Sequence, residues 1–311
     1  MKILRDIGDM GSIREPISMA AGTLDGIHIG HRAVIESAVR SAAEMGGQAW
    51  VLTFDPHPRK VLCEGEETLL LTSLPHKLRL IEGLDVDGCV LLSFTDEFCR
   101  KNPSEFIARL CEDVPALKEI VVGEDWRFGN DASGNVAMLE ELAADYGFRV
   151  KALKPIEVDG APVSSTRIRE AVASGDLSAA HRMLGRPFSV LGTVIPGRKI
   201  GRKLGYPTAN LTAGNEIEPP PGIYAVYALI NGHRHDGVAY YGSRPTFADE
   251  SHELLLEVHL FDGSFDLYSS EMEVCFIERI RGDRQFASSD ELISAIEADC
   301  ARARLILESQ P

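Results

Sequence analysis

Residues 22–31 read GTLDGIHIGH and continue directly from the apolar run at 17–22. The stretch packs three glycines and two histidines, His28 and His31, into ten positions. An apolar run that ends in a glycine-rich turn and is followed by helical spacing predicts a strand, a loop and a helix that starts near His31. Backbone amides and the helix dipole then converge on one point, which is typical of a phosphate-binding site.

The same alternation continues to about residue 155 and predicts a parallel α/β domain. Runs that are apolar throughout are typical of strands buried on both faces, so we expect a doubly wound, Rossmann-like sheet with helices on both sides. Its ligands should lie at the carboxyl ends of the strands. The predicted strands are 17–22, 48–54, 88–94, 118–123 and 148–153, and the predicted helices are 31–45, 75–84, 103–112 and 134–146.

Beyond Gly175 the pattern changes. Residues 176–184 predict one more short helix, and the turn pairs NG and DG stand at 231–232 and 262–263. Many short strands joined by tight turns favour an antiparallel barrel or sandwich. We therefore expect two domains, 1–184 and 185–311. The strand-like stretches of the second are 189–195, 222–230, 235–242, 253–261 and 271–280, and a terminal helix is predicted over 288–307.

Charge and cysteine content limit the class of protein. Asp and Glu number 47 against 32 Lys and Arg, a net charge of −15. Such a chain is not expected to bind long nucleic acid through its overall field, so any polyanion site must be local. The six cysteines form no C-x-x-C pair, no stretch reaches the ~18 apolar residues of a membrane span, and the N-terminus lacks a signal-peptide core. We expect a reduced, cytoplasmic protein that does not enter a membrane.

The histidine stretch suits chemistry on a phosphate. Glycines allow sharp turns and let a ligand approach the backbone. His28 and His31 are expected to share a face and to hydrogen-bond the α-phosphate of a nucleoside triphosphate under nucleophilic attack. The alternative is that both are ordinary turn and helix residues. The other residues of this loop expected at the phosphates are Gly22, Thr23, Asp25, Gly26 and Gly30.

Residues 164–172, SSTRIREAV, supply a second candidate anion site. Ser164, Ser165 and Thr166 are candidate N-caps of a helix whose first turn contains Arg167. Positive charge there opposes the helix dipole, which favours a role toward an external anion. A merely solvated arginine is the alternative.

Residues 123–131, GEDWRFGND, follow the fourth predicted strand. Asp125 and Phe128 therefore lie at the expected ligand edge of the sheet, beside Trp126. An acidic and aromatic patch suits a planar heterocycle. Alternatively, Trp126 and Phe128 belong to the core.

Residues 197–211, GRKIGRKLGYPTANL, form a basic, glycine-rich loop in an acidic chain. Such a loop can close over phosphates, although a solvated turn is the alternative. In the closing PTAN, Thr208 and Asn210 present two oxygen ligands on one side, as suits Mg²⁺ bound with triphosphate oxygens. Further on, strand alternation places Glu257 and His259 on one face, and Glu257 is the expected general base on a substrate hydroxyl. By count, most strand glutamates are merely exposed.

These motifs carry a family resemblance. HxGH at 28–31 and SSTRIR at 164–169 resemble the HxGH and ISSTxIR motifs of the nucleotidylyltransferase superfamily. With GYPTAN at 205–210, GSRPTF at 242–247 and EVHLFD at 257–262, nearly the whole chain resembles the prokaryotic bifunctional riboflavin kinase/FMN adenylyltransferases, in the family's order.

The resemblance implies a C-terminal six-stranded barrel that phosphorylates riboflavin and an N-terminal domain that adenylylates FMN, releasing pyrophosphate. Its implied partners are riboflavin, FMN, FAD, ATP and Mg²⁺, with no nucleic acid and no membrane, and it leaves the oligomeric state open. It assigns His28, His31, Arg167 and Glu257 to catalysis; Ser164, Ser165, Thr166, Arg198, Lys199, Gly201, Lys203 and Gly205 to ATP; Asp125, Phe128 and Arg244 to the flavin; and Thr208 and Asn210 to the metal.

Five positions depart from the family pattern. Thr23 and Leu24 replace Asn and Phe, Tyr240 and Tyr241 replace Asn and Ile, and Ser269 stands where a glycine is expected. Two alternatives follow from these changes: a monofunctional enzyme with one degenerate domain, or a non-catalytic flavin or nucleotide sensor. Another nucleotidylyltransferase, acting on pantetheine phosphate or NMN, would explain the first domain alone.

Overall fold

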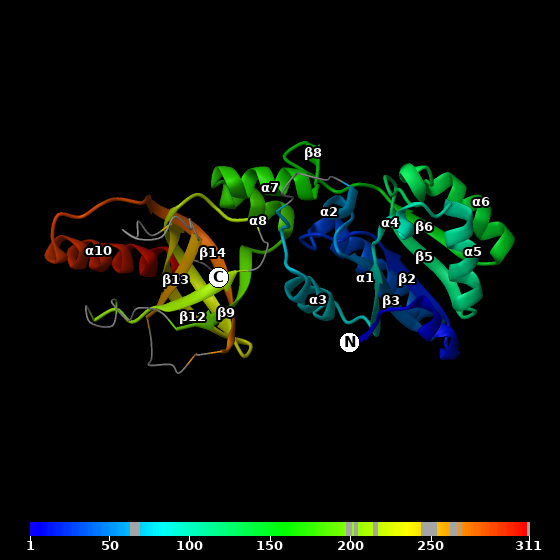
Figure 1. Ribbon diagram of the computed structural model, residues 1–311, viewed down its shortest axis with the longest axis horizontal. Coiled ribbons are helices and arrows are strands. Elements are labelled where there is room, and N and C mark those ends of the chain that lie inside the picture. The colour runs from blue at the N-terminus through cyan, green and yellow to red at the C-terminus, as the bar shows by residue number, and fades with distance from the viewer. Residues whose placement is uncertain are drawn as a thin grey trace. The chain divides into compact units, whose positions relative to one another are not determined.

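The structure is a computed structural model that describes residues 1–62, 69–196, 201, 205–213, 217–243, 254–261, 267 and 269–309. By packing, the chain divides into two compact units. The first comprises Met1–Thr68 and Lys77–Ser164, and the second Leu69–His76 and Ser165–Pro311. Each unit is described by itself, with the element labels of Figure 1.

The first unit is built on a six-stranded sheet whose strands are all parallel to their neighbours. The strand order is β1-β4-β3-β2-β5-β6, so the chain runs outward from β2 in one direction and resumes at β5 in the other. Ligand sites of such sheets lie where the order reverses, at the carboxyl ends of the strands. The strands are β1 Lys2–Leu4, β2 Ile17–Ala21, β3 Gln48–Asp55, β4 Gly88–Ser93, β5 Leu117–Gly123 and β6 Arg149–Leu153.

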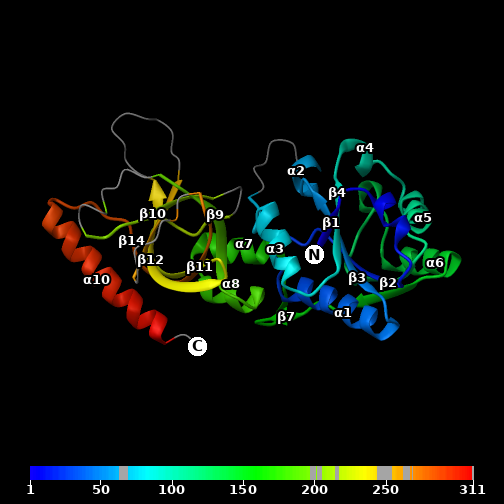
Figure 2. The same cartoon turned by 90° about the horizontal axis from the view of Figure 1, so that it is seen from below.

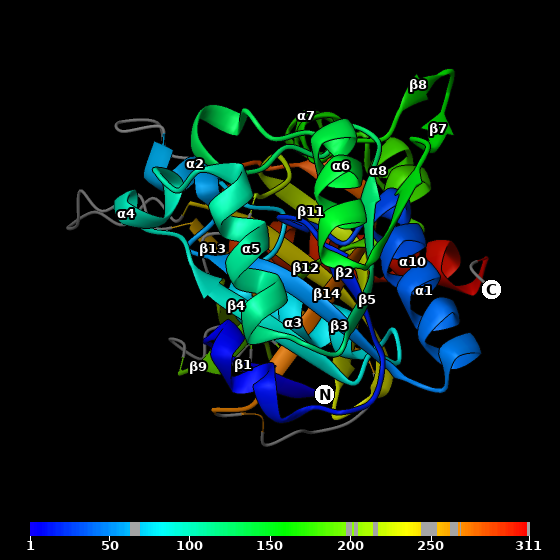
Figure 3. The ribbon, with the colours of Figure 1, turned by 90° about the vertical axis from the view of Figure 1, so that its right-hand side faces the viewer.

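Helices cover both faces of this sheet (Figures 2 and 3). On one face, α1 Ile29–Met45 and α3 Leu74–Glu82 pack against alternate strand residues such as Val51 and Val121. On the other, α5 Pro103–Asp113 and α6 Val136–Tyr146 pack over residues such as Trp50 and Ile120. Both faces of each central strand are thus buried, which is why those strands read as unbroken apolar runs.

The predicted parallel α/β domain is confirmed. The sequence reading missed β1, a three-residue edge strand paired with β4 at Lys2–Leu4. So short a strand carries no periodicity of its own, and its pairing supplies the structure. The remaining elements here are η1 Ile7–Ser12, α2 Pro58–Leu62, α4 Asp96–Cys99, η2 Asn130–Ala132, β7 Glu157–Val158 and β8 Ala161–Pro162.

The second unit contains a closed antiparallel barrel in the order β10-β13-β12-β11-β14-β9, as the family resemblance implied. Tyr224, Phe276 and Phe188 are fully buried, with Tyr224 edge-on to Phe276 at 5.3 Å between ring centroids. The strands are β9 Phe188–Ile195, β10 Ala209–Ala213, β11 Gly222–Ile230, β12 His233–Ser243, β13 Leu254–Leu260 and β14 Glu271–Gly282.

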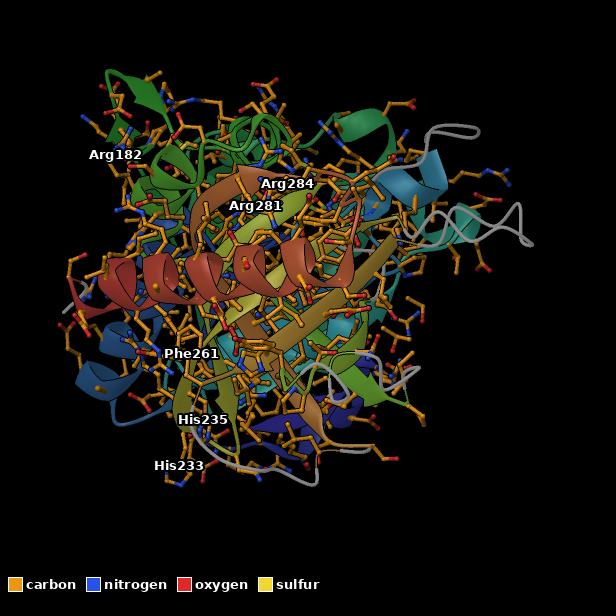
Figure 4. All side chains as sticks on the ribbon, turned by 90° about the vertical axis from the view of Figure 1, so that its left-hand side faces the viewer. Arg182, His233, His235, Phe261, Arg281 and Arg284 are labelled. Carbon is orange, nitrogen blue, oxygen red and sulfur yellow. The ribbon has the colours of Figure 1, made fainter. Side chains whose placement is uncertain are left out.

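The terminal helix α10, Ser289–Glu308, crosses one side of the barrel, where its Ala303, Ile306 and Leu307 pack with β11 and β12 residues (Figure 4). Ser288 caps it by accepting from the Glu291 amide at 3.2 Å. Arg281 of β14 holds Asp299 of α10 through two of its nitrogens, at 3.0 and 2.8 Å. This pair fixes the helix along the barrel.

The packing boundary differs from the predicted domain boundary after Leu184. The helices α7 Ser165–Ser174 and α8 Leu177–Leu184 belong to the second unit, because α8 packs on β9 and β14. The amphipathic face of α8 is buried against the barrel, and such packing is not visible in sequence order. Among the described residues, no helix is both long and apolar enough to cross a membrane.

Candidate functional site

The loop at residues 22–28, here called the histidine loop, follows β2, where the strand order reverses. His28 is the N-cap of α1, and its Nδ1 accepts a hydrogen bond from the His31 amide at 3.2 Å. The two imidazoles stack with centroids 3.5 Å apart and 19° between the ring planes. The helix therefore starts at Ile29, slightly before the predicted start near His31, because the His28 side chain satisfies a first-turn amide. The predicted proximity of the two rings is confirmed, and their role toward phosphate stays a prediction.

Local geometry explains two of the glycines of residues 22–31. Gly26 has φ +83°, a region that favours glycine. A Cβ on Gly30 would lie 3.1 Å from Cε1 of His28, so glycine there makes room for the imidazole over the first turn. Leu24 and Ile27 also have positive φ, +55° and +39°, which strains side chains with a Cβ. Backbone strain of this kind concentrates at binding and catalytic sites.

The Nδ1 atom of His31 is available to a ligand. Its Nδ1 is buried without a hydrogen-bond partner among the described residues. Burial, followed by the charges of His28 and Lys77, holds the pKa of His31 well below its ordinary value. A buried, unpartnered polar atom at the N-terminus of a 17-residue helix fits the oxygen of an anionic ligand.

Lys77, on α3, is a charged residue of this site that the sequence reading missed. It is 6% exposed, and its Nζ donates to the Phe54 carbonyl at 3.0 Å. Burial lowers the pKa of Lys77, while Asp25, Cys89 and Asp55 act in the opposite direction. A lysine in an amphipathic helix is ordinarily exposed, so nothing marked it out except its phase with the buried Ile81.

The loop residues Gly22, Thr23 and Asp25 take different positions. Gly22 donates its amide to the Leu52 carbonyl at 3.1 Å and so extends the pairing of β2 with β3. Thr23 is exposed, whereas Asp25 is buried at 2% exposure. A buried carboxylate opposite a buried ammonium is an electrostatic partner of Lys77, and its predicted contact with ATP stays a prediction.

The second anion motif begins α7. Ser165, Thr166 and Arg167 form its first turn, and Ser164 directly precedes it. By packing, Ser164 is the last residue of the first unit, and the second unit continues from Ser165. Arg167 is partly buried and Thr166 exposed. Their predicted contact with the triphosphate stays a prediction.

The loop after β5 separates two predicted flavin residues. Asp125 is exposed, whereas Phe128 is a core residue with 7% exposure. The Phe128 ring stacks under Trp126 at 4.6 Å and 17°, so Trp126, partly buried, is the ring nearer the surface. The structure favours the core alternative for Phe128, and a flavin contact by Asp125 stays a prediction.

In the second unit, the candidate metal ligand and the candidate base come together. Asn210 on β10 lies directly opposite Glu257 on β13 in the antiparallel pairing. Directly opposed residues share a face and have Cβ atoms about 5 Å apart. Asn210 is 5% exposed, and on β13 the buried Val258 and Leu260 alternate with Glu257 and His259, as predicted. His259 is oriented through Nδ1, 2.9 Å from the Pro207 carbonyl.

Thr208 lies one residue before β10, and Gly201 lies close to its side chain. A Cβ on Gly201 would lie 2.3 Å from the Tyr206 carbonyl oxygen, so only glycine allows this approach. Gly205 has φ +89°. The other predicted residues of the loop, Arg198, Lys199 and Lys203, lie outside the described residues, as does Arg244.

The departures from the family pattern have structural consequences. Tyr240 lies directly opposite Glu257 and donates its hydroxyl to Asp283 at 3.1 Å. Tyr241 points to the other face, and its buried hydroxyl has no partner among the described residues. Ser269 has φ +63°, which is why a glycine is expected there.

Beside Asp283 lies a hollow that the sequence reading missed. Its volume is about 670 Å³, within the usual range for small-molecule pockets. It is lined by Arg284, Gln285 and Phe286 and by α10 residues, with the Arg284 guanidinium 4.5 Å from the Phe286 ring centroid. Figure 4 shows Arg281 and Arg284 together beside α10. Its lining comes from one continuous stretch, the loop after β14 and the first half of α10.

Comparison with known proteins agrees along the whole chain. A model of the FAD synthetase family matches residues 11–167, and a model of the riboflavin kinase family matches residues 184–307. The intervening residues 168–183 include most of α7 and α8.

Three curated relatives share the description "bifunctional riboflavin kinase/FMN adenylyltransferase". The protein of Pseudomonas fluorescens is 35% identical over 306 residues, 98% of both chains. That of Haemophilus influenzae is 34% identical over 310 residues, 99% of this chain and 100% of the relative. That of Escherichia coli K12 is 33% identical over 306 residues, 98% of this chain and 97% of the relative.

Among solved structures, a Streptococcus pneumoniae protein described as a macrolide-efflux protein has the same fold over the full length. It superimposes with a TM-score of 0.85 at 28% sequence identity and covers 99% of each chain. The efflux description belongs to that protein. The two domain matches and the three relatives carry the assignment for this chain.

Proposed function

The chain belongs to the bifunctional riboflavin kinase/FMN adenylyltransferase family, and from that premise we propose how its residues divide the two reactions. It phosphorylates riboflavin with ATP and adenylylates FMN with ATP. The observation that carries the division is the presence of two separate polar sites, one at the stacked histidines and one at the Asn210–Glu257 pair.

In adenylyl transfer, a phosphate oxygen of FMN attacks the α-phosphorus of ATP and the bond to pyrophosphate breaks. His28 and His31 stabilise the charge that grows on the α-phosphate, and the amides of the first turn of α1 add to this field. The support is Nδ1 of His31 beside that turn, which has no hydrogen-bond partner in the part of the chain that the structure describes. The motif resemblance assigns Ser164, Ser165, Thr166 and Arg167 to the triphosphate and Asp125 to the flavin. No side chain forms a covalent bond.

In riboflavin phosphorylation, Glu257 takes the proton of the ribityl 5′-hydroxyl as its oxygen attacks the γ-phosphorus of ATP, and ADP leaves. The basic loop at 197–205 neutralises the triphosphate. The hollow beside Arg284 and Phe286 receives the isoalloxazine ring, because the aromatic ring of Phe286 lines it. Tyr240 supports this placement, since it lies opposite Glu257 on the neighbouring strand and donates a hydrogen bond to Asp283 beside the hollow.

We assign Mg²⁺ to the kinase site. Thr208 offers a hydroxyl and Asn210 an amide oxygen, next to the carboxylate of Glu257. Mg²⁺ keeps waters and substrate phosphates as ligands and so needs only one or two protein oxygens, which fits this donor set. Among the described residues no group of three or more His, Cys, Asp or Glu could hold a metal by itself. When bound, the ion neutralises charge on the transferred phosphoryl group. A cytoplasmic location stays a prediction.

One experiment tests the division of labour. The purified chain is incubated with riboflavin, ATP and Mg²⁺, and the flavins are separated by chromatography. We expect FMN and then FAD, with neither formed in EDTA. Asn210→Ala should raise the Mg²⁺ concentration that half-saturates FMN formation and leave FAD formation from added FMN unchanged. An unchanged Mg²⁺ requirement would contradict the metal assignment, and loss of both activities would contradict the two-site division.

A further inference from the structure

Lys77 occupies an unusual position for a lysine. It is 6% exposed on α3, and a buried ammonium is costly unless hydrogen bonds and opposite charges compensate it. The compensation comes from the carboxyl edge of the sheet. Nζ donates to the Phe54 carbonyl at 3.0 Å and to the Thr53 hydroxyl at 3.4 Å, both at the end of β3.

The Thr53 hydroxyl connects Lys77 to the histidine loop by a second hydrogen bond. Thr53 is fully buried, and its Oγ1 donates to the carbonyl of Thr23 at 3.0 Å. A hydroxyl has one proton to donate and can accept from Lys77 at the same time, so both hydrogen bonds are compatible. The path from α3 through β3 therefore ends on the backbone just before Leu24, where φ turns positive.

The loop at this point needs such a support. Leu24 and Ile27 lie in the left-handed region, and strained backbone persists only where its surroundings fix it. The same loop carries His28, whose ring must meet the phosphate with a placement accurate to a fraction of an ångström. The position of His28 therefore depends on the hydrogen bond that Thr53 donates to the Thr23 carbonyl of this loop.

We propose that Lys77 is a positioning residue for adenylyl transfer, acting through Thr53 on the loop that ends at His28, directly before the helical turn that contains His31. The inference rests on the assignment of that loop to the adenylyltransferase reaction. Lys77 holds the end of β3 through its hydrogen bonds to Thr53 and Phe54. Thr53 in turn donates a hydrogen bond to the Thr23 carbonyl, and the loop that begins there positions the imidazoles at the phosphate. The positive charge of Lys77 also acts on His31 directly.

Charged and titratable groups from several elements act on this pair. Asp25 belongs to the histidine loop, Asp55 to the end of β3 and Cys89 to β4, and each favours the charged form of Lys77. Burial, then His28, then Lys77 lower the pKa of His31. Removal of the Lys77 charge should therefore move the pKa of His31 upward.

The test is a double-mutant cycle with Lys77→Met and Thr53→Val, read as kcat/KM for FAD formation from added FMN. Each single change should lower kcat/KM for FAD formation about 10- to 100-fold. The double variant should have a kcat/KM no lower than that of the less active single variant. Thr53→Ser keeps the hydroxyl and should retain wild-type activity. Lys118→Met, which removes an exposed charge at the amino end of β5, is the matched control.

Riboflavin phosphorylation by the same preparations is the internal standard, and near-UV circular dichroism reports folding. The imidazole of His31, followed by NMR, should titrate at higher pH in Lys77→Met and at wild-type pH in Thr53→Ser. Fully additive losses would overturn the route through Thr53, and unchanged FAD formation in Lys77→Met would overturn the role of Lys77. If Lys77→Met does not fold, the Thr53→Val and Thr53→Ser pair decides: equal activity of the two overturns the proposal. Failure of the wild type to make FAD would instead refute the assigned function.

Discussion

His28 combines two functions that substitution can separate. Its Nδ1 caps α1 by accepting from the His31 amide, and its ring stacks on that of His31. Asparagine is among the best N-capping residues, so His28→Asn retains a cap and removes the imidazole. His28→Ala removes both.

The structure sets the expected sizes of the two effects. Both variants lose the same stacked ring, so their difference in stability isolates the cap, and His28→Ala should unfold with a free energy about 1 kcal/mol below that of His28→Asn. Both lose the imidazole N–H that donates toward the developing charge on phosphate, which corresponds to about 10²- to 10³-fold in kcat for FAD formation. Riboflavin phosphorylation should not change in either variant.

Two measurements check these numbers. Flavin chromatography should show FMN accumulating without FAD in both variants. Urea unfolding followed by tryptophan fluorescence reports the first unit alone, because the two tryptophans of the chain, Trp50 and Trp126, both lie there. FAD formation by His28→Asn within threefold of wild type would refute the role of the imidazole. Equal stabilities of the two variants would refute the capping role.

Three further substitutions and one control probe the second unit. Glu257→Gln should lower riboflavin phosphorylation about 10²- to 10⁴-fold and spare FAD formation from added FMN. Glu271→Gln, which changes an exposed glutamate at the start of β14, should leave both reactions unchanged. Wild-type ADP release by Glu257→Gln would exclude Glu257 as the base. Tyr241→Phe removes a buried hydroxyl without a partner among the described residues and should raise the free energy of unfolding by about 1 kcal/mol. Ser269→Gly relieves a φ of +63° and should raise it by somewhat less, since glycine loses more entropy on folding. Urea midpoints from far-UV circular dichroism that stay level or fall would contradict the last two.

The sequence alone determined the features that arise from local spacing. The glycine-rich stretch after an apolar run predicted a strand, a loop and a helix with His28 and His31 at the junction, and the structure shows them there. Strand alternation placed Glu257 and His259 on one face. These features depend on hydrogen bonds and periodicities within a few residues, so the printed sequence contains all of the information they need.

Only the tertiary structure decided which distant residues meet. The pairing of β10 with β13 sets Asn210 opposite Glu257, and the order of the parallel sheet buries Lys77 of α3 against the end of β3. Phe128 lies in the core although its loop resembles a ligand site, and α8 packs with the barrel although it precedes the predicted boundary. Strand order and long-range burial follow from how apolar faces are shared among elements far apart in the chain. A lysine that is buried for this reason looks, in sequence, like any lysine on a helix.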